Sequence, residues 1–195
     1  ATPAHSHSEL IINLAKYKKT FFVTKPLCTS KEELESIDSL RIKNSIDIFI
    51  DETFIYSNNV EKLKEIIKAD SFGELLYVSS DRSNYGRFQE KIDVIWDLAP
   101  HDISIVSYVT GKKPIGGKAI SMNPSNENQQ NSIAQLSIEY ENGLKLILNT
   151  SWLSPVKTRK MIFGGSEQTI VYDHLDEVEP LKLYSQKLVF EKKID

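Results

Sequence analysis

The sequence contains a single cysteine, Cys28, so no disulfide can form within the chain. It has no run near the ~20 apolar residues that a membrane helix requires. Its first residues also lack the basic and apolar segments of a secretory signal. These absences favour a protein of the reducing cytoplasm that does not enter a membrane, although a cysteine-poor exported protein fits them too.

Glycine-rich functional motifs are also missing. No GxGxxG turn, Walker A loop or GxSxG nucleophile elbow occurs, and there is no CxxC pair. Within these residues, the usual phosphate-binding turns and a thiol redox pair are therefore excluded. The formal net charge of −3 gives no reason to expect nucleic acid or an anionic membrane as a partner. Apolar residues make up 40% of the chain, which is ordinary for a soluble globular protein able to bury a core.

The beginning of the chain predicts a small α/β unit. Helical segments at residues 1–19 and 29–40 alternate with short apolar strands at 20–24 and 45–51. Both strands are apolar on both faces, which is typical of a buried parallel sheet. Two such strands cannot bury themselves, so we expect their natural neighbours to lie outside this chain.

Two features of these helices can be predicted in more detail. The spacing of Leu10, Leu14 and Tyr17 places them on one face of the first helix, which we expect to be its apolar face. Ser30 and Glu33 form a capping-box pattern, in which the serine side chain accepts a hydrogen bond at the start of the second helix.

The pattern changes after residue 52. A helix is predicted at 58–70 and a strand at 74–82, and the stretch 95–111 predicts a strand end followed by a helix. The remaining strands follow at short spacing, and several alternate apolar and polar residues, as in an antiparallel sheet with one open face. These strands are predicted at 118–122, 132–140, 144–152, 159–165, 169–173, 181–185 and 188–192.

The predicted fold is therefore an α/β stub followed by an α+β domain. The second part has a large, mainly antiparallel open sheet with helices on one face. The Asn-Gly step in Glu141–Gly143 predicts a hairpin turn, and Gly164–Ser166 predicts another turn. Because the helices are too few to cover both faces, we expect the open face to pack against a second copy, giving a homodimer or homotetramer.

The stretch WDLAPHDIS, residues 96–104, is the clearest candidate for chemistry. Asp97 and His101 are four residues apart and share one face of a helix. Pro100 suits a first helical turn, which places His101 near a helix N-terminus, where the helix dipole disfavours the imidazolium. A neutral histidine can act as a general base. Alternatively, Asp97 caps the helix and His101 packs beside Trp96.

Lys25 is the second candidate. It follows an apolar strand and precedes Pro26, which favours an extended backbone at Lys25. Its ammonium group then projects from the carboxyl end of a parallel strand, where ligands bind in open α/β sheets. The alternative is a solvated surface lysine.

Histidines near the N-terminus suggest a weaker hypothesis. His5 and His7 have a spacing that two metal ligands can adopt, but no third ligand accompanies them in the sequence. A metal-dependent sugar isomerase or lyase that uses His5, His7 and His101 is a remote alternative. We predict no metal site.

Two basic loops are candidates for anion binding. Guanidinium groups match phosphate and carboxylate oxygens in geometry, although an ordinary charged loop has the same composition. In the second loop, Trp152 either stacks on a sugar or base, or belongs to the core. The basic and turn-forming residues concerned are Arg82, Asn84, Gly86 and Arg87 in the first loop, and Lys157 and Arg159 in the second.

Taken together and in this order, the segments resemble the Gfo/Idh/MocA oxidoreductase family. ATPAHSHSELI is similar to the family's strand-end segment ATPxxxHxEL, and FFVTKPLCTS to its "EKP" segment. VIWDLAPHDISIVSYVTGKKP is similar to the helix that carries its second catalytic motif. DRSNYGRF and SWLSPVKTR resemble segments of members that act on nucleotide sugars, such as UDP-N-acetylglucosamine 3-dehydrogenases.

The resemblance implies an NAD(P)-dependent dehydrogenase of a sugar or nucleotide sugar. By position, Lys25 and His101 flank the hydroxyl group that is oxidised, and Asp97 orients or tunes the pair. One of Lys25 and His101 takes the hydroxyl proton as hydride passes to the nicotinamide, and a cationic Lys25 stabilises the developing alkoxide. The sequence leaves open which of the two is the base.

The resemblance also implies binding residues for the cofactor, NAD or NADP, and for the substrate. The residues expected to bind the substrate are those of the two basic loops and Asp102. The cofactor-binding residues expected by position are Thr2, Pro3, His7, Lys25 and Pro26.

Two departures from the family pattern limit this expectation. Thr24 replaces the glutamate of the EKP segment, and the family's first strands and glycine-rich turn are expected upstream of Ala1. Residues 1–52 are then the C-terminal remnant of a dinucleotide-binding Rossmann domain, and residues 53–195 a substrate-binding and oligomerisation domain. We expect this chain alone to bind the cofactor weakly or not at all. The alternative is a non-catalytic ligand-binding or dimerisation module derived from such an enzyme.

Overall fold

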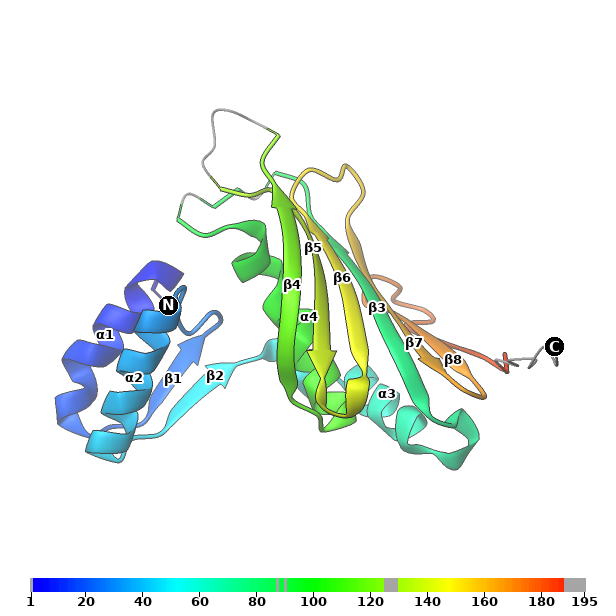
Figure 1. Ribbon diagram of the computed structural model, residues 1–195, viewed down its shortest axis with the longest axis horizontal. Helices are drawn as coiled ribbons and strands as arrows, with labels where there is room; N and C mark the ends of the chain where they lie inside the picture. Colours follow the sequence, from blue (N-terminus) through cyan, green and yellow to red (C-terminus); the bar gives the residue numbers. More distant parts are fainter. Residues whose placement is uncertain (1, 87, 90, 125–129, 188–195) are drawn as a thin grey trace, which may run out of the picture.

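The computed structural model describes residues 2–86, 88–89, 91–124 and 130–187, which fold into a small and a large part (Figure 1). The two parts are joined by a short 3-10 segment, Thr53–Tyr56. Arg87 and the strand predicted at 188–192 lie outside the described residues.

The small part contains two parallel strands and two helices. β1 (Phe21–Thr24) pairs in register with β2 (Ile48–Asp51). The helices are α1 (His7–Leu14) and α2 (Lys31–Asn44). As predicted, Ser30 caps α2, because its Oγ accepts a hydrogen bond from the Glu33 backbone N–H at 3.1 Å. A small core joins the helices to β1, and its buried members are Ile11, Val23, Cys28 and Ile37.

The predicted apolar face of α1 is wrong. Leu10, Leu14 and Tyr17 are exposed, whereas Ile11 and Ala15 are buried. The segment ELIINLA is apolar on more than one side, so its periodicity does not select which stripe faces the strands.

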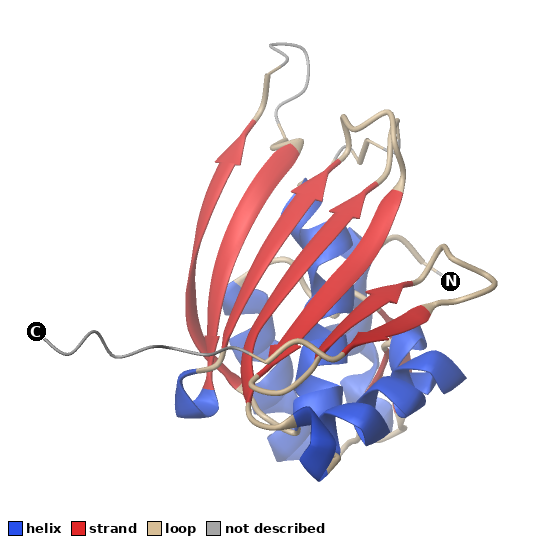
Figure 2. Cartoon of the chain, turned by 90° about the vertical axis from the view of Figure 1, so that its right-hand side faces the viewer, coloured by secondary structure: helices blue, strands red, loops and turns tan. Residues whose placement is uncertain are grey.

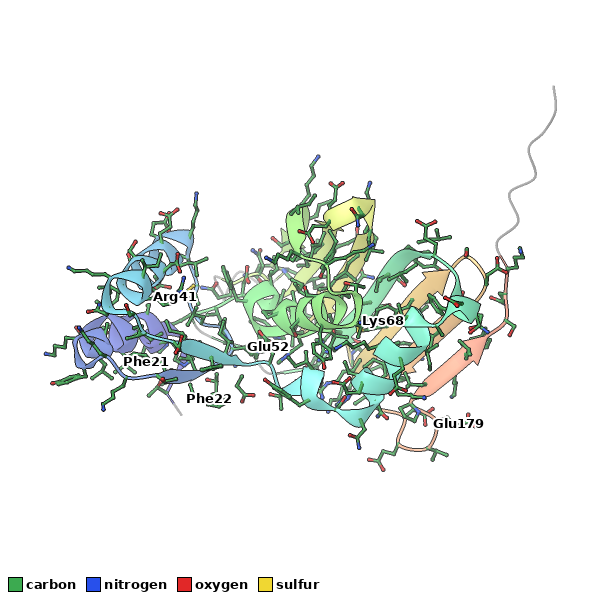
Figure 3. The ribbon with its side chains drawn as sticks, turned by 90° about the horizontal axis from the view of Figure 1, so that it is seen from below. Phe21, Phe22, Arg41, Glu52, Lys68 and Glu179 are labelled. Carbon is green, nitrogen blue, oxygen red and sulfur yellow. The ribbon has the colours of Figure 1, made fainter. Side chains whose placement is uncertain are left out.

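One face of the small sheet is uncovered in this chain. Phe22 and Phe49 are adjacent in the β1–β2 register and are 75% and 58% exposed. Figure 3 shows Phe22 on the side of β1 away from α2. Two neighbouring phenylalanines on a parallel sheet are the pattern of a surface that another layer normally covers.

The large part is built on a seven-stranded sheet in the order β4-β5-β6-β3-β7-β8-β9. β3 and β6 are parallel, and all other neighbouring strands are antiparallel. The predicted large, mainly antiparallel sheet is therefore confirmed. Its strands are β3 (Leu75–Ser83), β4 (Pro114–Met122), β5 (Ile133–Tyr140), β6 (Lys145–Ser151), β7 (Thr158–Gly165), β8 (Thr169–Asp173) and β9 (Leu181–Tyr184).

Helices α3 (Asn58–Lys68) and α4 (Val94–Thr110) lie on one face of this sheet (Figure 2). The alternation along β5 follows from that arrangement, because its even-numbered residues are buried toward the helices and its odd-numbered ones are exposed, apart from half-buried Ile133. The Tyr140 hydroxyl donates to the Ile103 carbonyl oxygen of α4 at 3.2 Å, which joins the sheet to the helix that carries Asp97 and His101.

Helix α4 begins earlier than its sequence predicts. Asp93 is the N-cap, and its Oδ1 accepts from the backbone N–H groups of Ile95 and Trp96 at 3.0 and 3.2 Å. Pro100 therefore lies inside the helix. Both the placement of His101 at a helix N-terminus and the alternative of Asp97 as the cap are wrong. Burial of the apolar face of α4 outweighs the ~3 kcal/mol that an internal proline costs.

The turn predicted at Gly164–Ser166 is confirmed only at its last residue. Both glycines belong to β7, and the chain bends after them, at Ser166. A Cβ atom at Gly164 would lie 2.1 Å from the Tyr77 ring, so the glycine is needed for close packing between β7 and β3. By contrast, the hairpin at Asn142–Gly143 is confirmed, because both residues have positive φ angles.

Among the described residues, none of the helices has the length and apolarity needed to cross a bilayer.

The Asp93 cap gives a test of the fold. Replacing Asp93 by Ala should lower the free energy of unfolding by about 1 kcal/mol, because two N–H groups at the start of α4 lose their acceptor. Asp93→Asn should retain most of the stability, since the amide oxygen can accept the same bonds. Urea denaturation of the two variants measures this, and equal stability of Asp93→Ala and the parent chain would contradict the capping role.

Candidate active site

A polar cavity of about 220 Å³ lies where the end of β1 meets α4 and the large sheet. Three cationic side chains and one carboxylate are among the described residues that line it. It brings together both sequence-predicted catalytic segments and part of both basic loops. The lining residues are Lys25, Arg82, Ser83, Asn84, Gln89, Asp97, Leu98, His101 and Arg159.

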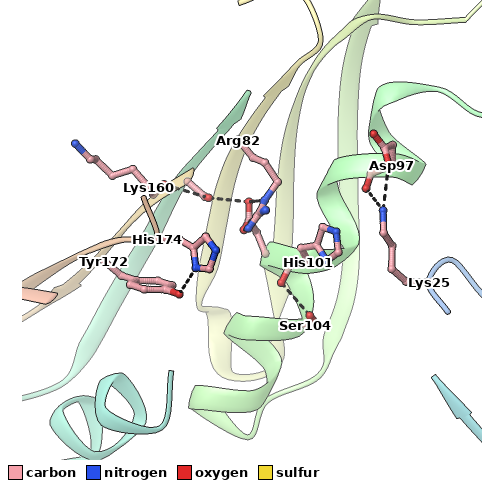
Figure 4. Close-up of polar contacts among 10 residues, drawn as sticks. Lys25, Arg82, Asp97, His101, Ser104, Lys160, Tyr172 and His174 are labelled. Carbon is pink, nitrogen blue, oxygen red and sulfur yellow. Dashed lines mark hydrogen bonds and ion pairs between the residues drawn. The ribbon is translucent and has the colours of Figure 1, made fainter. Parts of the chain in front are cut away.

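Asp97 fixes the position of Lys25. The Lys25 Nζ donates to Asp97 Oδ1 at 3.1 Å and also to the Asp97 backbone carbonyl oxygen (Figure 4). From the other side, Trp152 Nε1 donates to Asp97 Oδ2 at 3.0 Å. Trp152 is fully buried, so it belongs to the core and is not a stacking platform for a ligand. Lys25 is thus an ion-paired residue at the cavity, not a solvated surface lysine.

His101 lines the same cavity one helical turn after Asp97. Its Nδ1 atom is buried and has no hydrogen-bond partner in the described part of the chain. Burial and the nearby cations Lys25, Arg82 and Arg159 lower its pKa from 6.5 to about 3. His101 is therefore neutral near pH 7, as predicted. The cause differs from the predicted one, because desolvation and neighbouring charges lower its pKa rather than the dipole at a helix N-terminus.

Arg82 and Asp102 form a buried ion pair beside the cavity. The Arg82 Nε atom lies 3.0 Å from both carboxylate oxygens of Asp102, and Nη2 donates to Oδ1. Ser80 Oγ donates to Oδ2 at 3.0 Å. Arg82 and Asp102 are 4% and 1% exposed. Asp102, predicted to bind substrate, instead holds Arg82, while Arg82 itself reaches the cavity wall.

Phe54 and His174, both missed by sequence reasoning, lie beside the site without being among its lining residues. The Phe54 ring lies edge-on to His101 and His174, with centroid distances of 4.7 and 4.9 Å. The guanidinium carbons of Arg82 and Arg159 lie 4.8 and 5.7 Å from the Phe54 centroid. No local motif marks either residue, because Phe54 comes from the connecting segment and His174 from the end of β8.

Glu52 is a third residue that the sequence did not reveal. It follows β2, next to the β1 end that carries Lys25, and Figure 3 shows it between the two parts of the molecule. Burial raises its pKa, against the opposing effects of a hydrogen bond from Ser104 and the charge of Lys25. Thr24 leaves the EKP segment without its glutamate, but Glu52 supplies a carboxyl group near Lys25 from the neighbouring strand.

The residues predicted to bind the cofactor form a second cluster. The two ring nitrogens of His7 lie 2.9 Å from the Pro26 carbonyl oxygen and 3.1 Å from that of Thr2. His7 thereby holds the start of α1 beside the residue that follows Lys25. Pro3 lines a different cavity of about 290 Å³, with Phe88 and Gln89 among its neighbours.

The remaining predicted substrate residues divide into two groups. Asn84 lines the cavity with Arg159, whereas Lys157 is exposed and is not among its lining residues. The Gly86 backbone N–H donates to the Trp152 carbonyl oxygen, so Gly86 shapes the loop. Arg87 lies outside the described residues.

The metal hypothesis receives no support from the described residues. No group of three or more potential ligands gathers anywhere in them. His7 places both ring nitrogens near carbonyl oxygens.

Comparison with known proteins assigns the chain to a family. The model of the GFO/IDH/MocA C-terminal domain matches residues 60–171, which include α4 and most of the large sheet. The chain belongs to the GFO/IDH/MocA oxidoreductase family. The resemblance of its motifs to this family is thus confirmed.

Individual relatives of this GFO/IDH/MocA chain are distant. It is 22% identical over 202 residues to 2,7-anhydro-N-acetylneuraminate hydratase of Escherichia coli K12, covering 95% of this chain and 54% of that protein. An uncharacterised oxidoreductase of Streptococcus pneumoniae serotype 4 is also 22% identical, with 97% and 55% covered. The chain therefore spans about half the length of the curated relatives it matches.

Solved structures share the fold at similarly low identity. UDP-N-acetylglucosamine 3-dehydrogenase GnnA from Acidithiobacillus ferrooxidans has a TM-score of 0.78 and 19% identity, covering 99% of this chain and 63% of that one. GenD2 from gentamicin A biosynthesis, solved in complex with NAD, has a TM-score of 0.81 and 16% identity, covering 92% and 54%.

The depressed pKa of His101 predicts how stability depends on pH. The unfolded chain takes up a proton on His101 as pH falls through about 6.5, whereas the folded chain does so only near 3, so stability is lost between these values. His101→Gln should weaken the decrease seen between about pH 7 and pH 5. Urea unfolding at several pH values measures this, with His5→Gln at an exposed histidine as control. An unchanged pH dependence in His101→Gln would refute the assignment.

The Arg82–Asp102 pair predicts a large effect on stability. Asp102→Asn should lower the free energy of unfolding by about 3 kcal/mol or more, because Arg82 stays buried without its counter-ion. Asp47→Asn makes the same chemical change at an exposed site and should have little effect. Denaturant titrations compare the two, and a similarly small loss in both would show that the pair is dispensable.

Proposed function

We propose that this chain is the substrate-binding part of an NAD(P)-dependent dehydrogenase of a sugar or nucleotide sugar. The observation that carries the proposal is the single cavity lined by Lys25, Asp97 and His101. It combines a fixed cation with a neutral imidazole, which are the groups that alcohol oxidation requires. Family membership and the names of GnnA and GenD2 support the same class of reaction.

Lys25 and His101 have different roles at the reacting hydroxyl group. Lys25, held by two oxygens of Asp97, keeps a positive charge where an alkoxide develops. His101 presents an uncharged ring that can accept the hydroxyl proton. The Lys25 and Asp97 side chains are only 19% and 20% exposed, which limits the access of water to this ion pair. A bound nicotinamide would supply the hydride acceptor for the carbon that bears this hydroxyl group.

The residues near Lys25 fit the reactive end of such a cofactor. The His7 ring lies between the carbonyl oxygens of Thr2 and Pro26, and a neutral ring donates to one of them. This places the three residues near the carboxyl end of β1, where ligands bind in parallel α/β sheets. The uncovered Phe22–Phe49 face and the greater length of the relatives support a further part of the dinucleotide domain outside this chain. On this proposal, residues 1–52 are the end of the dinucleotide domain and residues 53–195 the substrate domain, in a homodimer or homotetramer formed through the open sheet face.

Ligand binding tests whether this chain contains the sugar site but only part of the cofactor site. Isothermal titration should show binding of UDP-N-acetylglucosamine and much weaker or no binding of NADH, because the chain holds the sugar cavity without a glycine-rich pyrophosphate turn. Tight NADH binding would contradict the proposed split between the two halves.

Turnover by the whole protein tests the catalytic role of Lys25. Lys25→Met should reduce kcat by about a hundredfold or more while the protein still binds sugar, because the cation that stabilises the alkoxide is lost. Lys16→Met changes an exposed lysine on the small part and serves as the control. Parent-like kcat in Lys25→Met, measured as NADH formation, would exclude Lys25 from the chemistry.

A further inference from the structure

The oxidation proposed above uses one carboxyl group, that of Asp97, yet a second lies near Lys25. Glu52 begins the connecting segment, where its backbone carbonyl oxygen accepts from the Ile55 N–H at 3.1 Å. Its side-chain atom Oε2 is buried and has no hydrogen-bond partner among the residues that the structure describes. An ionised carboxylate is costly to bury without partners, so this environment favours the neutral acid.

The groups that face the Glu52 carboxyl group come from three elements. Lys25 directly follows β1, Asp51 is the last residue of β2, and Ser104 belongs to α4. Burial raises the pKa of Glu52 above 4.5 and the charge of Asp51 adds to the rise, whereas the Ser104 hydrogen bond and the Lys25 charge oppose it. Because burial is the largest of these effects, Glu52 is protonated to a greater extent than a solvated glutamate at the same pH.

The Ser104 hydroxyl group connects Glu52 to the backbone of His101. Ser104 Oγ donates to the His101 carbonyl oxygen at 2.8 Å, one turn back along α4 (Figure 4). A serine hydroxyl has a single hydrogen to donate, although its oxygen can also accept. Because that hydrogen is directed at His101, the bond between Ser104 and Glu52 needs a hydrogen from the carboxyl group. The protonated carboxylic acid has one and the carboxylate does not.

Two features make the position of the His101 ring depend on its backbone. The ring atom Nδ1 has no hydrogen-bond partner in the described part of the chain. Pro100, the preceding residue, has no N–H group and cannot bond to the Trp96 carbonyl oxygen one turn back. A helix that lacks one of its bonds can bend at that point. The additional bond from Ser104 to the His101 carbonyl oxygen therefore limits displacement of the ring.

The connecting segment contacts His101 in a second way. Phe54, two residues after Glu52, lies edge-on to the His101 ring with a centroid distance of 4.7 Å. The bond from the Ile55 N–H to the Glu52 carbonyl oxygen closes the turn that carries Phe54. One short segment therefore contacts both the ring of His101 and, through Ser104, its backbone.

We propose that Glu52 is a positioning residue for His101, acting as a carboxylic acid that donates to Ser104 Oγ while Ser104 donates to the His101 carbonyl oxygen. This inference rests on the proposed function, because it assigns Glu52 to the reaction that His101 serves. Glu52 is not among the described residues that line the cavity, so it acts through His101 and not on the substrate.

Ionisation of Glu52 breaks this chain of bonds. The carboxylate can only accept, so the Ser104 hydroxyl turns toward it and the His101 carbonyl oxygen loses its additional bond. The chain of bonds is therefore present at low pH and is lost as the pH rises through the raised pKa of Glu52. His101 itself gains a proton only near pH 3, so its own titration lies at the acid end of the range.

NMR titration of the 195-residue chain tests the link without turnover. The signal of the Glu52 carboxyl carbon should give a pKa above 4.5, and the His101 ring signals should change at the same midpoint. Ser104→Ala should leave Glu52 with a raised pKa but remove this change from His101. His101 signals that do not follow Glu52, or that still follow it in Ser104→Ala, would overturn the proposal.

Variants at Glu52 distinguish a donated hydrogen from a charge. Glu52→Gln can donate at every pH, so its His101 signals should stay close to those of the parent at low pH. Glu52→Ala has no donor, so its signals should resemble those of the parent at high pH. Glu35→Gln makes the same chemical change at an exposed glutamate of α2 and should titrate as the parent does. Identical His101 signals in Glu52→Gln and Glu52→Ala would contradict a donated hydrogen.

Turnover by the whole protein tests the positioning role. Glu52→Ala should lower kcat for UDP-N-acetylglucosamine about tenfold with little change in KM, because a displaced His101 accepts the proton less well. Glu52→Gln should regain most of this loss. Ser104→Ala should lower kcat by a similar factor, and the double variant should be no slower than either single variant, because both changes break the same chain of bonds.

The outcomes separate this inference from the proposed function. Full kcat in Glu52→Ala, or losses that multiply in the double variant, would exclude the positioning role and leave the dehydrogenase in place. A parent protein that forms no NADH from a panel of UDP-sugars would overturn the proposed function, and with it the catalytic purpose of Glu52, even where the NMR titration shows the bonds to be present.

Discussion

The carboxylate of Asp97 is the interaction on which the rest of the site depends. One oxygen accepts from Lys25 of the small part, and the other accepts from Trp152 in the core of the large part. The same residue also offers its backbone carbonyl oxygen to Lys25. A single side chain of α4 therefore positions the cation that we propose to be catalytic, and it joins the two parts at the cavity. Such a partly desolvated, hydrogen-bonded carboxylate holds its partners far more firmly than a surface ion pair.

Around this anchor, the protein gathers positive charge next to an uncharged histidine. Arg82 is neutralised by Asp102 and Lys25 by Asp97, so the buried cations have built-in counter-ions. Pairing with a carboxylate offsets part of the desolvation penalty of each of these two cations. His101 receives no such counter-ion and instead loses its proton.

The connection between the two parts contributes directly to the site. Glu52 lies near Lys25 and Ser104, and Phe54 separates His101 from His174. A segment that links domains is usually a solvated spacer. Here it supplies a buried carboxyl group and an aromatic wall, so movement of one part relative to the other would alter the site.

The sequence by itself determined the class of fold, the family resemblance and the central catalytic candidates. These follow from local signals: strand alternation in β5, the Ser30 cap, and the spacing of Asp97 and His101. Prediction from the sequence failed where tertiary packing outweighs the local conformational preference, as with Pro100 inside α4 and Gly164 inside β7. Only the tertiary structure brought Glu52, Phe54 and His174 close to residues that line the cavity and assigned Trp152 to the core. Contacts between residues far apart in the chain decide those positions, and no periodicity or motif records them.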